Sequence, residues 1–154
     1  KSITLNKLNS KKLYSPEVTR LSSIIAKKLF VRNALKSFQK KFIKNSRLVV
    51  IEGRDIGSKI MPNADLKLFF TCSVKEKAKR RLKEFKMLNK KITLKDVEKA
   101  LIQRDKEDTE RKISPLILKK NAVIVDTTKL NIKQMETKLI NLVTNSIKKK
   151  YGNL

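Results

Sequence analysis

The sequence has no histidine, a single cysteine and few acidic residues, and each scarcity excludes a class of function. Without histidine the chain has neither the usual general base nor the commonest metal ligand, and one cysteine makes a zinc site implausible. Because Cys72 is the only cysteine, no internal disulfide can form, and a reducing cytoplasm is the expected location. No apolar run is long enough to span a bilayer, so no membrane partner is expected. The chemistry is therefore expected to use arginine, lysine and carboxylates.

The charge of the chain is strongly one-sided, with 39 Lys and Arg residues against 14 Asp and Glu residues and a net charge of +25. Such a balance is typical of nucleic-acid-binding proteins. However, the cations are mostly lysines scattered along every segment, and no arginine-rich arm or basic stripe interleaved with aromatic residues is present. We therefore expect the lysines to cover solvated faces of one domain, and the eight arginines to be the informative cations.

Two of the three glycines lie in one short element, Glu52-Gly53-Arg54-Asp55-Ile56-Gly57, directly after the apolar run 48–51. This pattern predicts a buried strand at 48–52 that delivers Arg54 and Asp55 to the carboxyl edge of a sheet, where ligands of open α/β sheets bind. An arginine there suits a phosphate, and a carboxylate can accept from an exocyclic amino group. A turn stabilised by a local Arg54–Asp55 pair remains the alternative interpretation.

Helix-start signals and hydrophobic periodicity predict helices that alternate with strands. Ser15-Pro16 opens a helix that breaks near Phe30 and continues in a second phase, and a small hairpin is expected over 3–14. The remaining predicted elements are strands at 48–52, 66–71 and 122–126, and helices at 73–88, 93–108 and from Asn131 onward. This alternation predicts an α/β fold with a parallel sheet.

A second candidate constellation lies in the segment 104–111, which holds four of the 14 acidic residues. If the helix continues, Arg104, Asp108 and Arg111 share one face at i, i+4 and i+7. They could preorganise one another for a sugar hydroxyl or a base edge. The alternative is a solvated helix with ordinary ion pairs, each contributing about 0.3–0.5 kcal/mol. Arg32 and Ser23 would by themselves have capping or surface roles.

With these pieces in place, the chain resembles bacterial cytidylate kinases, nucleoside monophosphate kinases that phosphorylate CMP and dCMP. The resemblance covers nearly the whole chain. The matching segments are 15–18, 31–35, 51–57, 62–65, 78–81, 104–116 and 126–128. The G-R-D-I-G element and the R-D-x-x-D-x-x-R element at the right distance from it are the specific parts of the match.

The resemblance implies a role for each candidate site residue. Asp55, Arg32 and Arg111 would face the cytosine, Arg54 would hold the acceptor phosphate, and Ser23, Arg104 and Asp108 would contact the sugar. No catalytic residue and no metal ligand is assigned. Phosphoryl transfer depends on positioning and cationic stabilisation more than on an acid or base, which suits a site without histidine.

The sequence departs from the family in one respect, because it contains no G-x-x-G-x-G-K-[ST] loop. The resemblance implies that the intact enzyme uses ATP and Mg²⁺, and that this chain is the C-terminal portion. Residues 1–46 would be a remnant of the monophosphate-binding insertion. Residues 47–154 would form the α/β core, an incomplete parallel sheet of the P-loop nucleoside monophosphate kinase type flanked by helices, with a lid segment at about 86–115.

The same resemblance implies a vacant position in the sheet between the strands at 48–52 and 66–71, and no kinase activity for this chain alone. A monomer that binds CMP or dCMP is expected. The two alternatives are a basic nucleic-acid-binding α/β domain and a catalytically inactive CMP binder.

Overall fold

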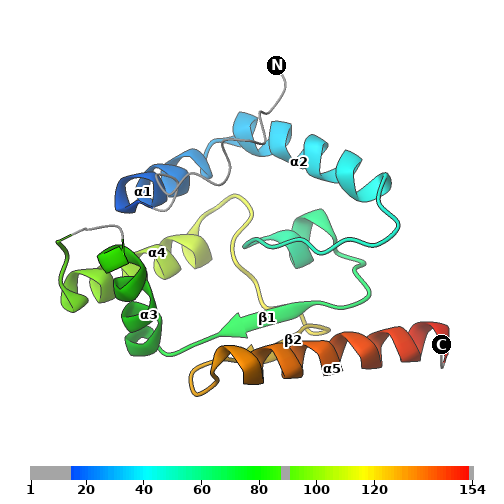
Figure 1. Cartoon of the computed structure of the whole chain (residues 1–154). Coiled ribbons are helices and arrows are strands. Elements are labelled where there is room, and N and C mark those ends of the chain that lie inside the picture. The colour runs from blue at the N-terminus through cyan, green and yellow to red at the C-terminus, as the bar shows by residue number, and fades with distance from the viewer. Residues whose placement is uncertain (1–14, 88–90, 153–154) are drawn as a thin grey trace.

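The computed structural model describes residues 15–87 and 91–152, and the hairpin predicted over 3–14 lies outside these ranges. The elements in chain order are α1 (Pro16–Ile25), α2 (Leu29–Lys44), the π-helical turn η3 (Ile56–Ile60), β1 (Leu68–Thr71), α3 (Val74–Met87), α4 (Leu94–Glu110), β2 (Val123–Asp126) and α5 (Ile132–Tyr151). Figure 1 shows α1 and α2 along one side and α5 along the opposite side, with the two strands next to α5 and the α3–α4 pair at one end.

The helices begin where the capping signals predict. The Ser15 hydroxyl accepts a hydrogen bond from the backbone N–H of Val18 at 3.2 Å, at the start of α1. Asn131 and Gln134 form a complete capping box at the start of α5, in which each side chain accepts from the backbone of the other residue. The break between α1 and α2 falls at residues 26–28, close to its predicted position.

The sheet consists of β1 and β2, which pair in parallel with Leu68 opposite Val123 and Thr71 opposite Asp126. The chain crosses between them through α3 and α4, because parallel neighbours need a long connection. Val125 of β2 is fully buried. The predicted α/β class with an incomplete parallel sheet is therefore confirmed.

The strand predicted at 48–52 is wrong: this segment, between α2 and η3, carries no strand assignment and pairs with no strand in the described part of the chain. Leu48 is 86% exposed and Val50 is 99% exposed, although both side chains are apolar. A strand exists only if its backbone groups bond to a neighbour, and within residues 15–87 and 91–152 β1 has β2 as its one partner. The sequence pattern of a buried strand is present, but the pairing and the burial are not.

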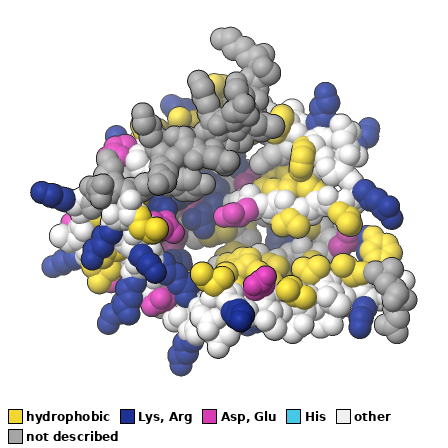
Figure 2. Space-filling model, in the orientation of Figure 1, with side chains coloured by type: hydrophobic (Ala, Val, Ile, Leu, Met, Phe, Trp, Pro, Cys, Tyr) yellow, Lys and Arg dark blue, Asp and Glu magenta, His cyan; other side chains and the backbone are white. Residues whose placement is uncertain are grey.

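The main hydrophobic cluster lies between α3 and α4. Ala78, Phe85 and Val97 are its buried members, and partly buried apolar side chains pack around them. This cluster fixes the direction of α4, whose C-terminal half carries the segment 104–110. Figure 2 shows further hydrophobic side chains gathered on the surface over α5, where Ile132 and Ile140 are exposed. None of the described helices combines the length and the apolar character needed to cross a bilayer.

Candidate functional site

The glycine element forms a tight bend that leads into η3. A Cβ at Gly53 would lie 2.8 Å from Cγ1 of Ile56, closer than real contacts, so any other residue here would have to displace the Ile56 side chain. The carbonyl of Asp55 accepts from the backbone N–H of Lys59 at 2.8 Å, which starts η3. The bend thus sends Arg54 and Asp55 to different neighbours, instead of allowing them to pair with each other.

Asp55 forms an ion pair with Arg32 of α2, and this pair makes the first group of the site. Both side chains are largely buried, at 16% exposed for Arg32 and 12% for Asp55. Arg32 also donates from Nη1 to the carbonyl of Ala26, the C-cap residue of α1, at 3.1 Å. Arg32 and Asp55 are 23 positions apart in sequence and meet in space; the family resemblance implies that both face the same base.

A second group forms around Asp108, which is buried near the end of α4. Nε of Arg54 lies 3.1 Å from Oδ2 of Asp108, and Nη1 of Arg111 donates to Oδ1 at 3.3 Å. The Arg111 and Asp108 side chains are only 7% and 9% exposed. The interpretation of this segment as an ordinary solvated helix is therefore wrong for these two residues.

Arg104 adds a third guanidinium to this group. Burial lowers the pKa of Arg104, the positive charge of Arg54 lowers it further, and the Asp108 carboxylate raises it. Nε of Arg104 is buried and has no hydrogen-bond partner in the described part of the chain. Because Arg54, Arg104 and Arg111 surround one carboxylate, the group carries a net charge of +2 (three cations and one anion) and suits an anionic ligand.

Two cavities adjoin these groups, and Lys112 and Ile113 line both of them. The first has a volume of about 330 Å³ and is bordered by Arg32 and Asp55. The second has a volume of about 370 Å³ and is bordered by Arg111.

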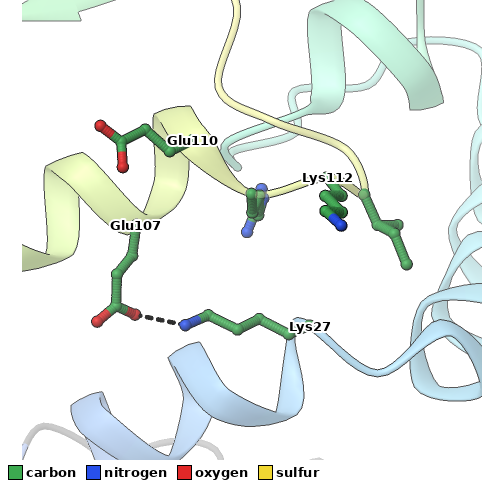
Figure 3. Close-up of a pocket in the computed structure, with 6 residues that line it drawn as sticks. Lys27, Glu107, Glu110 and Lys112 are labelled. Carbon is green, nitrogen blue, oxygen red and sulfur yellow. Dashed lines mark hydrogen bonds and ion pairs between the residues drawn. The ribbon is translucent and has the colours of Figure 1, made fainter.

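Figure 3 shows residues that line the second cavity, among them Lys27 of the α1–α2 connection, which points toward Glu107 of α4. The Lys27 ammonium donates to Glu107 at 2.8 Å and lowers the pKa of that carboxyl, and the Gln103 amide lowers it further. The bridge joins the N-terminal helices to α4 beside the site.

The structure does not bring Ser23 to either group. Its hydroxyl donates to the carbonyl of Thr19 at 3.4 Å within α1, and it lines neither cavity. Its assignment to the sugar stays a prediction.

Sequence reasoning missed several residues that line the two cavities, because lysine is too common in this chain to stand out and an isolated serine carries no signal. These residues are Lys27, Lys36, Lys59, Lys112 and Ser114.

Comparison with known proteins gives one consistent result. A family model described as cytidylate kinase matches residues 1–145. The chain is 42% identical over 129 residues to a cytidylate kinase of Thermosipho africanus, covering 84% of this chain and 58% of that protein. It is 38% identical over 134 residues to a cytidylate kinase of Thermotoga maritima (87% and 60%). It is also 38% identical over 141 residues to a cytidylate kinase of Mycoplasmoides gallisepticum (91% and 62%). The chain thus spans about six tenths of the length of these relatives.

Proposed function

Because the chain belongs to the cytidylate kinase family, we propose that the two groups bind CMP or dCMP as the phosphoryl acceptor. In the intact enzyme, the γ-phosphoryl group of ATP would pass to the phosphate of the bound nucleotide, giving CDP or dCDP and ADP. The observation that carries the proposal is a cluster of three arginines around the buried Asp108, of net charge +2, close to the largely buried Arg32–Asp55 pair and to two cavities. Such an arrangement combines an anion site with a polar site for a base.

Asp55 is proposed to select cytosine over uracil. Cytosine presents an amino donor where uracil presents a carbonyl acceptor, so a fixed carboxylate attracts the first base and repels the second. Arg32 holds the largely buried Asp55 side chain in place through their ion pair. When uracil is bound, the largely buried Asp55 carboxylate lacks a donor from the base, and this costs binding free energy. The cost provides the discrimination between the two bases.

Arg54 is proposed to hold the acceptor phosphate, and Arg104 and Asp108 to contact the sugar. Arg54 is the most suitable phosphate ligand because its side chain is 44% exposed while one edge rests on Asp108. The resemblance assigns Arg111 to the cytosine, whereas its bonds lie within the Asp108 group. We therefore propose that Arg111 faces the phosphate side of the nucleotide. Ser23 remains a proposed sugar contact.

ATP and Mg²⁺ are proposed as co-substrate and metal of the intact enzyme, bound outside the groups described above. In residues 15–87 and 91–152, no cluster of three or more cysteine or carboxylate side chains could hold a metal ion, so no residue of this chain is assigned to Mg²⁺. We propose that residues 1–46 belong to the monophosphate-binding insertion, that about 86–115 form a lid, and that the protein is a cytoplasmic monomer. With no glycine-rich phosphate loop in its sequence, this chain is proposed to be inactive alone.

Calorimetric titration of the chain with CMP and UMP tests the proposal. CMP is expected to bind about 5- to 150-fold more tightly, which corresponds to about 1–3 kcal/mol for one well-placed polar contact. Asp55→Asn should reduce this ratio, because an amide can also donate to uracil. The matched control is Asp65→Asn, the same change at an exposed carboxylate, and it should leave the ratio unchanged. Equal affinities for CMP and UMP in the unmodified chain would refute the assignment of Asp55.

The same titrations separate this function from nucleic-acid binding. A basic nucleic-acid-binding domain would bind oligonucleotides regardless of base, and its affinity would fall steeply with salt. Binding of a single nucleotide with a preference for cytosine is expected only for the proposed acceptor site.

A further inference from the structure

Ser114 has an unusual backbone conformation beside the site. Its φ of 52° is positive, and within residues 15–87 and 91–152 no other residue except glycine has a positive φ. A side chain disfavours this left-handed region. In addition, Ser114 precedes Pro115, whose ring favours an extended conformation for the preceding residue. Since neither local preference explains the conformation of Ser114, contacts with the surrounding residues must hold it.

The left-handed conformation turns the chain back on the end of α4. The carbonyl of Ser114 accepts a hydrogen bond from Nε of Arg111 at 2.7 Å. A second hydrogen bond holds the same turn: the backbone N–H of Leu116 donates to the carbonyl of Asp108 at 2.7 Å. Ser114 accepts the hydrogen bond from Arg111 through its backbone carbonyl. The position of the acceptor therefore depends on the backbone conformation of Ser114 and not on its hydroxyl.

These contacts restrict Arg111 to one orientation. Its Nε is held by Ser114 and its Nη1 by Asp108, two anchor points on one planar guanidinium. Among the described residues, Arg111 uses Nε and Nη1 for these bonds, so Nη2 is the guanidinium nitrogen that we expect to meet a ligand. Ser114 also lines the 330 Å³ cavity next to Asp55, so the turn borders both groups of the site.

We propose that Ser114 is a positioning residue, whose left-handed backbone aims the Arg111 guanidinium at the phosphate of the bound nucleotide. This inference rests on the proposed function and adds a determinant of nucleotide affinity in the backbone of the loop after α4. It requires a residue at position 114 that can adopt a positive φ. It does not require serine.

Three variants of the full chain test this requirement. Ser114→Val introduces a β-branched side chain, which strongly disfavours positive φ, whereas Ser114→Gly adopts it without cost. Pro115→Ala is a milder change that opens the helical region to Ser114. The matched control is Ser37→Val, the same substitution at an exposed serine of α2.

Titration with CMP and with cytidine gives the main readout, because only CMP carries the phosphate. Ser114→Val is expected to weaken CMP binding about tenfold, which corresponds to about 1.4 kcal/mol. The affinity for cytidine should stay within about twofold of that of the unmodified chain, because cytidine has no phosphate for Arg111 to bind. Pro115→Ala should shift CMP binding in the same direction by a smaller factor, and Ser114→Gly and Ser37→Val should match the unmodified chain. In an Arg111→Ala background, Ser114→Val should cause no further loss.

A nuclear magnetic resonance signal of the Arg111 Nε–H provides a readout that does not depend on ligand. The unmodified chain and Ser114→Gly should show this proton protected from exchange, and Ser114→Val should not. If Ser114→Val binds CMP as tightly as the unmodified chain, or loses CMP and cytidine equally, the positioning role is refuted while the proposed function stands. If the unmodified chain binds no CMP, the proposed function fails, and this inference with it.

Discussion

Replacement of Asp108 by asparagine tests whether the buried carboxylate holds the arginine cluster together. The change keeps the shape of the side chain and removes its charge. With an effective dielectric constant of about 20, the attraction between Asp108 and Arg111 at 3.3 Å is about 5 kcal/mol before desolvation is counted. Arg54 lies at a similar distance from Asp108, 3.1 Å, but its side chain is 44% exposed. Solvent therefore screens most of the attraction between Arg54 and Asp108.

The net effect is smaller than these attractions, because the charges also lose hydration when they are buried. Removal of one partner of a buried pair costs about 3–5 kcal/mol, and the asparagine oxygen can still accept a hydrogen bond, so we expect the lower end, about 3 kcal/mol. Asp105→Asn is the matched control on the same helix. Its pair with Lys77 has the same type of contact, 2.8 Å long, but both side chains are 34% exposed. Its loss should cost at most about 1 kcal/mol.

Urea unfolding followed by circular dichroism at 222 nm measures both variants against the unmodified chain. The free energy of unfolding should fall about three times more for Asp108→Asn than for Asp105→Asn. Inorganic phosphate should restore part of the loss in Asp108→Asn, because an anion replaces the missing charge among the arginines. If the two variants lose the same small free energy and phosphate stabilises neither, the cluster is a solvated surface feature, and the reasoning about its charge is wrong.

Three further predictions concern the elements around the site. Phe85→Ala should lower the free energy of unfolding by about 3 kcal/mol, since Phe85 is buried between α3 and α4, and an effect below about 1 kcal/mol would contradict this packing. Asn131→Ala should cost about 1 kcal/mol in the same assay through loss of the capping box, and no change would show that the cap is dispensable. Lys27→Ala should raise the pKa of Glu107 toward its ordinary value of 4.5, and by more than Gln103→Ala does, as measured by carboxyl chemical shifts. Because the folded-state pKa of Glu107 is lowered, the Lys27–Glu107 ion pair stabilises the fold above about pH 4.5 and loses this effect as the pH falls through the folded-state pKa. An ion pair that persists well below the folded-state pKa would refute this prediction.

The helices of this protein could be predicted because their signals are local. The caps at Ser15, Thr93 and Asn131 each accept a hydrogen bond from a backbone N–H three residues away, so nearby residues in the sequence suffice to predict them. The strand at 48–52 could not be judged in the same way. Its apolar pattern is that of a buried strand, but pairing depends on a neighbour that local sequence does not specify, and Val50 lies 99% exposed.

The site residues show the same division between local and distant information. The arginines stood out because they are rare among the cations of this chain, and the Gly53–Gly57 element marked a special bend. The sequence left the ion-pair partners of Arg54 and Asp55 open. Arg54 could have paired with its neighbour Asp55, but the bend separates the two side chains and directs them to Asp108 and Arg32.

The sequence alone determined the helix boundaries, the parallel α/β class, the family and the identity of the arginines and carboxylates that form the candidate site. Only the tertiary structure decided that Asp55 meets Arg32, that Arg54 meets Asp108, and how deeply Asp108 is buried. The physical reason is range. Caps and periodicity act within a few residues, whereas burial and ion pairing depend on segments that are distant in sequence and adjacent only after folding.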